Sequence, residues 1–260
     1  MKYAYAGNRD LGAWVLAFLA GEGYRPEALF LTDEDDEHVR EMIRVADLPP
    51  SRVFRGRDGL ESAQDLLQDL DLDYIFGIHY PFLVGKRFLE LPKHGFLNLH
   101  PAYLPFNRGW HTPSWAILEG TPTGATLHVM SEDLDRGDII HQKEVQVGAG
   151  DTANSLYRRL KRAELEVFKE AWPQLRTFTA ARTPQSLTGS SHSRRELRTP
   201  SVAELDIDAS YSLRDLLKRL RALTTNDLSE ACYFVEGDKK FRVTVRIEEE
   251  AQPGPGHPTR

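Results

Sequence analysis

Short apolar runs alternate with longer segments of helical apolar spacing through most of the chain. The runs have the length of buried strands, and strands that alternate with helices indicate βαβ units and a parallel sheet. Strands are expected at residues 2–6, 28–31, 52–54, 74–78, 95–99, 124–130 and 138–147. Helices are expected at residues 11–19, 37–45, 61–70, 112–118 and 152–172, the last ending at Pro173. The sequence therefore predicts an α/β fold with a mostly parallel sheet.

A change in composition follows the last of these helices. Residues 177–200 are rich in Ser, Thr, Arg and Pro and are expected to form a linker or excursion. Residues 201–250 contain a basic amphipathic helix and two apolar runs around a Gly-containing turn, which predicts a small α+β module with a β-hairpin. Residues 251–260 are rich in Pro and Gly and are expected to be a disordered tail. The main domain is then residues 1–176.

Two polar side chains, Asn98 and His100, stand at alternate positions where one apolar run ends. Side chains two residues apart in a strand point to the same face, and ligands of open α/β sheets bind at the carboxyl ends of strands. Asp135 follows in a Gly-Asp turn about one βαβ unit later. An amide donor, an imidazole base and a carboxylate together suit acyl transfer. For a lone histidine, a purely structural role at the strand end would be the better interpretation.

Two further loops are candidates for binding. The turn after the first expected strand has too few glycines for a dinucleotide fingerprint, but its backbone N–H groups and Arg9 suit a phosphate. A plain turn with a surface arginine is an equal alternative. The loop at residues 79–83 is apolar although it is loop-like, so it either fills the core or lines a pocket for a flat ligand.

The charge balance, the histidine spacing and the cysteine count limit which partners, metals and cellular locations are expected. The chain has 33 Lys and Arg against 39 Asp and Glu, a formal net charge of −6, so it lacks the overall basic excess of a typical nucleic-acid binder. The histidines show no zinc-site spacing, and no metal is expected. The one cysteine, Cys232, fits a reducing, cytoplasmic location. No signal peptide or membrane-spanning run is expected.

Several segments together resemble one known family. Asn98-Leu99-His100-Pro101, Arg108-Gly109, the strand at residues 124–128 and Asp135-Arg136-Gly137-Asp138 resemble the folate-dependent formyltransferases. This family includes glycinamide ribonucleotide formyltransferase, methionyl-tRNA formyltransferase and the sugar-nucleotide N-formyltransferases. The resemblance covers residues 1–175. It implies a Rossmann-like catalytic domain with helices on both faces of the sheet, N10-formyltetrahydrofolate as donor and an amine as acceptor. It also implies that Asn98, His100 and Asp135 are catalytic.

The loop at residues 103–109 and the C-terminal module are most similar to the sugar N-formyltransferases, which implies a nucleotide-linked aminodideoxysugar as acceptor. Such enzymes would serve lipopolysaccharide O-antigen biosynthesis. Formylation of methionyl-tRNA, hydrolysis of formyltetrahydrofolate and a binding module without turnover are the alternatives. Apolar residues of the hairpin suit a homodimer interface.

The resemblance also suggests which residues bind the donor, and the residue types of two loops suggest which bind the acceptor. The expected donor-binding residues are Tyr80, Phe82, Leu83, Ser131, Glu132 and Leu134. The expected acceptor-binding residues are Asn8, Arg9, Tyr103, Asn107, Arg108 and Trp110. Asn8 and Arg9 are placed near phosphates, and Trp110 either stacks on a base or packs beside a turn.

Overall fold

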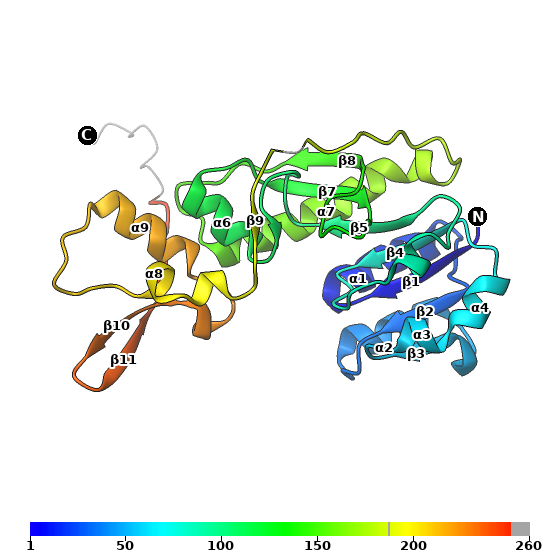
Figure 1. Cartoon of the computed structure of the whole chain (residues 1–260), viewed down its shortest axis with the longest axis horizontal. Coiled ribbons are helices and arrows are strands. Elements are labelled where there is room, and N and C mark those ends of the chain that lie inside the picture. Colours follow the sequence, from blue (N-terminus) through cyan, green and yellow to red (C-terminus); the bar gives the residue numbers. More distant parts are fainter. Residues whose placement is uncertain (187, 251–260) are drawn as a thin grey trace, which may run out of the picture.

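A seven-stranded sheet forms the centre of the computed structural model, which describes residues 1–186 and 188–250 (Figure 1). The strand order is β3-β2-β1-β4-β5-β7-β8. Strands β1 to β5 are parallel, whereas β7 pairs antiparallel with both β5 and β8. The strands are β1 (Tyr3–Gly7), β2 (Ala28–Leu31), β3 (Val53–Arg55), β4 (Tyr74–Ile78), β5 (Phe96–His100), β7 (Gly124–Val129) and β8 (Ile139–Glu144). The predicted α/β class with a mostly parallel sheet is confirmed.

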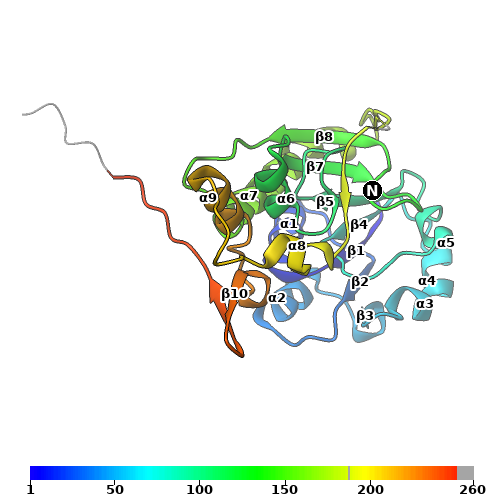
Figure 2. The ribbon, with the colours of Figure 1, turned by 60° about the vertical axis from the view of Figure 1, so that its left-hand side comes forward.

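Helices flank the sheet on both faces. They are α1 (Arg9–Gly21), α2 (Glu37–Ala46), α3 (Gly59–Ser62), α4 (Gln64–Asp69), α5 (Lys86–Leu89), α6 (Thr112–Glu119) and α7 (Ala153–Leu175), with a 3-10 turn at Pro50–Arg52. Helices α1, α2 and α7 pack on one face, and α3, α4 and α5 pack on the other. Figure 2 shows the same layers from the side of the C-terminal elements.

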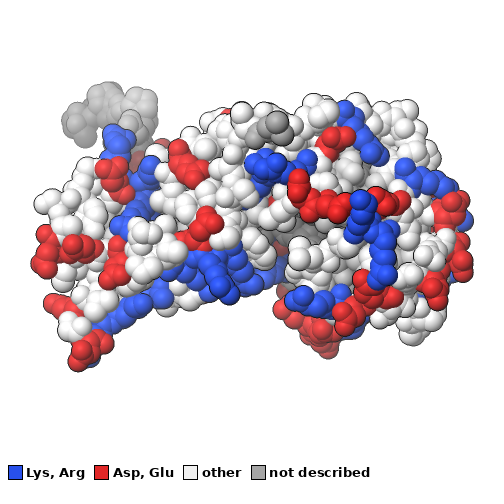
Figure 3. Space-filling model, in the orientation of Figure 1, with Lys and Arg blue, Asp and Glu red and all other residues white. Residues whose placement is uncertain are grey.

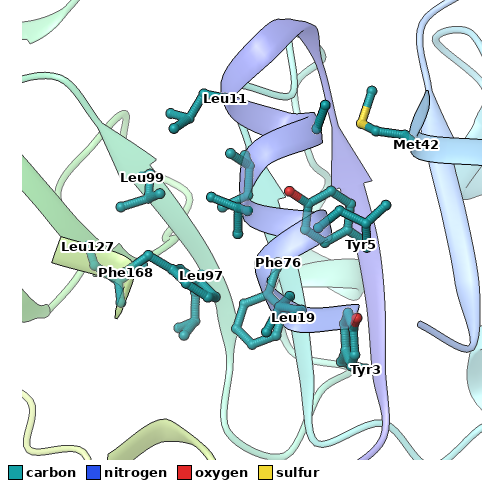
Figure 4. Packing of buried hydrophobic residues seen from close by; sticks show 14 of the residues in the cluster. Tyr3, Tyr5, Leu11, Leu19, Met42, Phe76, Leu97, Leu99, Leu127 and Phe168 are labelled. Carbon is teal, nitrogen blue, oxygen red and sulfur yellow. The ribbon is translucent and has the colours of Figure 1, made fainter. Parts of the chain in front are cut away.

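Alternation of side chains along the strands creates two apolar layers. Tyr3 and Tyr5 of β1 face α1 and α2, whereas Ala4 and Ala6 face α3 and α4. Figure 4 shows the first layer, in which Tyr5, Phe76 and Leu97 lie between the strands and the overlying helices. A strand that is buried on both faces has a continuous apolar sequence. The positions of such strands could therefore be predicted from the sequence to within a few residues.

Two expected helices need correction, and a further helix was not expected. The helix expected at residues 61–70 is two short helices, because Ala63 adopts φ −101° and ψ 9° between them. The long helix does not end at Pro173 but reaches Leu175, since Trp172 and Leu175 are both buried in the core. Helix α5 was not expected from the sequence, because its four residues are too few to show an apolar period.

The elements after α7 begin with a short strand near the middle of the molecule and continue at the end opposite β3 (Figure 1). They are β9 (Ser191–His192), α8 (Pro200–Ala203), α9 (Leu213–Ala222), β10 (Cys232–Glu236) and β11 (Lys239–Val243), with 3-10 turns at Glu196–Arg198 and Leu228–Glu230. A third apolar cluster joins them to α6 and the start of α7. Strands β10 and β11 form the expected hairpin. The tail expected to be disordered lies outside the described residues.

In the part of the chain that the structure describes, we find no helix with the length and apolar character that crossing a bilayer requires.

Candidate active site

The site lies on the face of β5 that carries Asn98 and His100. Leu97 and Leu99 point into the layer under α1 and α7, so Asn98 and His100 point to the opposite face, on the same side as Phe96. Loops cover this part of that face. Thr126 of β7 accepts the N–H of Leu104 at 3.2 Å and donates to the Ala102 carbonyl at 2.7 Å, which holds the loop after β5 in place.

Asn98, His100 and Asp135 come together here, as the sequence led us to expect. His100 Nε2 lies 3.6 Å from Asp135 Oδ2. His128 Nε2 lies 3.7 Å from Asp135 Oδ1, and Asn98 Nδ2 lies 3.3 Å from His128 Nε2. His100 is buried, and its Nε2 has no hydrogen-bond partner within the described residues. An imidazole nitrogen held close to a carboxylate but not bonded to it is free to exchange a proton with a substrate.

His128 is a site residue that the sequence reasoning missed. It stands directly opposite Asn98 in the antiparallel β5–β7 pairing. Its Nδ1 lies 2.9 Å from the Val129 carbonyl, which requires an N–H at Nδ1 and leaves Nε2 to accept from Asn98. Burial lowers the pKa of His128, so the ring stays neutral and this arrangement persists. His128 therefore orients the Asn98 amide and leaves its second N–H available.

Asp135 is held by residues from two other parts of the chain. Its Oδ2 accepts the backbone N–H of Gly109 at 3.0 Å. Gln185 Nε2 donates to the carbonyls of Asp135 and Gly137, at 2.9 and 2.7 Å. Asp135 itself has a φ of 52°, in the left-handed region. Its carboxylate position thus depends on the segments around residues 109 and 185.

The expected donor-binding residues lie in two loops that meet beside the site. Tyr80 and Phe82 are half-buried with their rings in edge contact, and the Tyr80 hydroxyl is buried without a partner in the described residues. Leu83 and Leu134 are exposed, by 92% and 51%. Ser131 and Glu132 are also exposed, and Glu132 pairs at 2.9 Å with Lys86, at the start of α5 and three residues after Leu83.

The expected acceptor-binding residues are more scattered. Asn8 is buried with Oδ1 unpartnered among the described residues, and Arg9 is exposed with a φ of 56° at the start of α1. Tyr103 is half-buried in the loop after β5. Arg108 is buried, and Trp110 is 44% exposed with the Arg194 guanidinium 5.0 Å from its ring centroid.

Asn107, also expected to contact the acceptor, is hydrogen-bonded within the protein. It is buried, its Nδ2 donates to Thr121 at 2.8 Å, and its Oδ1 accepts from Ser190 at 3.1 Å. These two bonds anchor the loop that carries Asn107 to Thr121 and Ser190.

Metal ligands do not gather in the described residues, where no group of three or more His, Cys, Asp or Glu could hold an ion. Cys232 is buried, and burial raises the pKa of its thiol to about 11. A protonated thiol in that position is a poor nucleophile.

Comparison with known proteins identifies the family. The family model described as "Formyl transferase" matches residues 32–172. The chain belongs to this formyl transferase family. A second model, described as an N-formyltransferase dimerization C-terminal domain, matches residues 200–249 of the formyl transferase chain.

Three relatives illustrate the range of the family. The chain is 30% identical to a dTDP-4-amino-4,6-dideoxyglucose formyltransferase of Mycobacterium bovis over 59% of its own length and 65% of that protein's. It is 28% identical to a methionyl-tRNA formyltransferase of Alkaliphilus oremlandii over 98% of its length and 84% of that protein's. It is 29% identical to the formyltransferase PseJ of Anoxybacillus kamchatkensis, solved with UDP-4,6-dideoxy-4-formamido-L-AltNAc and tetrahydrofolate. That match has a TM-score of 0.52 and covers 64% of this chain and 86% of PseJ.

Proposed function

We propose that this formyl transferase moves a formyl group from N10-formyltetrahydrofolate to the amine of a nucleotide-linked aminodideoxysugar. The observation that carries the proposal is the unpartnered His100 Nε2, 3.6 Å from Asp135 and on the same strand face as Asn98. The names of the Mycobacterium and Anoxybacillus relatives support both the acceptor class and the folate donor.

Each of the three side chains has a separate task in this proposal. His100 accepts a proton from the acceptor amine as the amine nitrogen bonds to the formyl carbon. The free N–H of Asn98 donates to the oxyanion that forms on the formyl oxygen. The bond from that carbon to N10 then breaks, N10 receives the proton from His100, and an N-formyl amide and tetrahydrofolate result. Asp135 stabilises the imidazolium form of His100 between these two proton transfers.

The donor is proposed to bind between the loop that carries Tyr80, Phe82 and Leu83 and the loop that carries Ser131, Glu132 and Leu134. The Lys86–Glu132 ion pair connects the start of α5, just after the first loop, to the second loop. The exposed leucines Leu83 and Leu134 offer apolar surface for a flat ring system. Burial raises the pKa of Tyr80 to about 12, so its hydroxyl remains a hydrogen-bond donor.

The acceptor is proposed to contact Asn8, Arg9, Tyr103, Arg108 and Trp110. Arg9 stands at the start of α1, where its guanidinium and the positive end of the helix dipole favour a phosphate, while the first-turn N–H of Leu11 is donated to Asp10 Oδ1 at 2.9 Å. Arg108 is a buried guanidinium with Nε unpartnered among the described residues, which favours an anionic ligand. Trp110 presents an exposed ring for stacking on a base.

We also propose that residues 1–176 form the catalytic domain and residues 201–250 a module that pairs two copies of the chain. Val235 and Phe241 on the hairpin are exposed by 43% and 41%, and the second family model is named for dimerization. Residues 177–200 link the two. A cytoplasmic location and a product destined for lipopolysaccharide O-antigen belong to the same proposal.

Formylation of methionyl-tRNA is the second candidate, because the Alkaliphilus relative matches 98% of the chain. Figure 3 shows basic side chains in a band along the lower edge of one face, over the C-terminal elements, with acidic and basic residues mixed elsewhere. Binding of tRNA would weaken steeply as salt concentration rises.

An acceptor screen decides between these functions. The protein is incubated with N10-formyltetrahydrofolate and, separately, with UDP-, dTDP- and GDP-linked aminosugars, with methionyl-tRNA, or with no acceptor. Formylated sugar nucleotide, detected by mass spectrometry, is the expected product. Formylation of methionyl-tRNA alone would favour the second candidate, and tetrahydrofolate release without any acceptor would indicate hydrolysis by water.

A further inference from the structure

The segment between α7 and the C-terminal module crosses the site. In Figures 1 and 2 the stretch that carries β9 runs from the region of β8 past α6 to α8. Thr183 exchanges backbone hydrogen bonds of 2.8 Å with Ile139, at the start of β8. Farther along, β9 pairs with β6 (Arg108–Gly109), and Trp110 N–H donates to the His192 carbonyl at 3.0 Å. The segment is therefore fastened to the domain on both sides of Gln185.

The Gln185 side chain donates hydrogen bonds to two carbonyl groups of the turn that carries Asp135. Its Nε2 donates to the Asp135 carbonyl at 2.9 Å and to the Gly137 carbonyl at 2.7 Å. Carbonyl oxygens only accept hydrogen bonds, so the amide nitrogen of Gln185 must be the atom that faces the turn. Both N–H groups of the Gln185 amide are thereby used.

The backbone conformation of this turn is unfavourable without stabilising contacts. Asp135 has a φ of 52°, and a non-glycine residue held in the left-handed region costs about 1–3 kcal/mol unless its surroundings compensate. Gln185 fixes the backbone of Asp135, while the Gly109 N–H fixes its carboxylate at 3.0 Å. The two contacts come from segments that β6 and β9 pair together.

We propose that Gln185 is a positioning residue, which holds the backbone of Asp135 so that the carboxylate stays beside His100. This inference rests on the proposed function, because it gives Asp135 a task in formyl transfer. Loss of the two donated hydrogen bonds would let the turn relax, and a displacement of about 1 Å at a catalytic group costs about 100-fold in rate.

The test variant is Gln185→Glu, which keeps the size of the side chain but sets carboxylate oxygens against two carbonyls. We expect kcat to fall by about 100-fold, while KM for donor and acceptor changes little. Arg182→Gln is the matched control, since Arg182 lies in the same segment and donates to the His94 carbonyl, away from Asp135. Its kcat is expected to equal that of the unchanged protein.

A double variant separates positioning from a general structural role. If Gln185 acts through Asp135, then Gln185→Glu combined with Asp135→Asn should be no slower than Asp135→Asn alone. The inference would be overturned if the loss of kcat in the double variant equalled the product of the losses in the two single variants. It would also be overturned if kcat were unchanged in Gln185→Glu.

Amide hydrogen exchange gives a readout that does not require turnover. Residues 131–138 should exchange faster in Gln185→Glu than in the unchanged protein or in Arg182→Gln. Unchanged exchange would overturn the inference even if activity fell. Absence of formyl transfer by the unchanged protein to any acceptor would instead contradict the proposed function, while exchange would still decide whether Gln185 holds the turn.

Discussion

Replacement of Asn98 by alanine tests the proposed chemistry most directly. Asn98 has two amide N–H groups, of which one faces His128 Nε2 at 3.3 Å and the other is available to the oxyanion. Loss of one such donor costs about 3–4 kcal/mol in the transition state, so we expect kcat to fall by about 10²–10³-fold. Binding of the substrates in the ground state should change little, because the oxyanion exists only during the reaction.

The effect of Asn98→Ala on stability should be small by comparison. Asn98 is half-buried, and a hydrogen bond of this kind contributes about 1 kcal/mol to folding. In a protein of this size that lowers Tm by about 2–4 °C, which leaves the variant folded at assay temperature. Asn98→Asp should be slower than Asn98→Ala, since its negative charge lies where the oxyanion forms and close to Asp135.

The assay is single-turnover formation of tetrahydrofolate with the acceptor found in the screen, together with Tm for each variant. Asn226→Ala is the control, because Asn226 is an exposed asparagine in a loop of the C-terminal module. A loss of less than about tenfold in Asn98→Ala would refute the oxyanion role, since a single donor is worth more than that elsewhere.

Three further predictions concern the neighbouring residues. His100→Asn should lower kcat by orders of magnitude and leave donor binding largely intact, as measured by folate titration; near-normal turnover would remove His100 from the chemistry. Arg9→Ala should raise KM for the acceptor more than KM for the donor, and equal changes would contradict a phosphate contact. Burial lowers the pKa of His128 below its usual value, so the unfolded chain binds more protons at that residue. Stability should therefore fall as pH decreases below about 6.5, by up to about 1.4 kcal/mol per pH unit. Thermal melts should show a shallower fall in His128→Gln, and identical slopes would contradict the burial argument.

The sequence predicted the sheet because its signal is local. Strands β1, β2 and β4 are continuous apolar runs. In β5, the alternation of apolar residues with Asn98 and His100 places these two side chains on one face without any knowledge of the neighbouring strands. The convergence of Asp135 on this face was expected from the family resemblance, and the structure brings it within 3.6 Å of His100.

The parts that the sequence did not predict depend on long-range contacts. His128 faces Asn98 only because of the antiparallel register of β7 on β5. Gln185 meets the turn 48 to 50 positions earlier in the chain, in a segment without regular periodicity. The hydrogen bonds of the Asn107 side chain to Thr121 and Ser190 join residues 14 and 83 positions apart, so no local pattern indicates them.

The reversal of chain direction at β7 has a consequence for how this family can vary. Because β7 runs antiparallel to β5, Val129 at the end of β7 lies opposite Leu97, near the start of β5. The connection to β8 must then fold back over the sheet to bring Asp135 to His100. A residue inserted into or deleted from this connection would leave the sheet intact yet move the carboxylate out of reach. Gene variants of altered length between residues 130 and 138 are therefore expected to yield folded but inactive protein, whereas similar changes at the exposed hairpin turn around Gly237 should leave turnover intact.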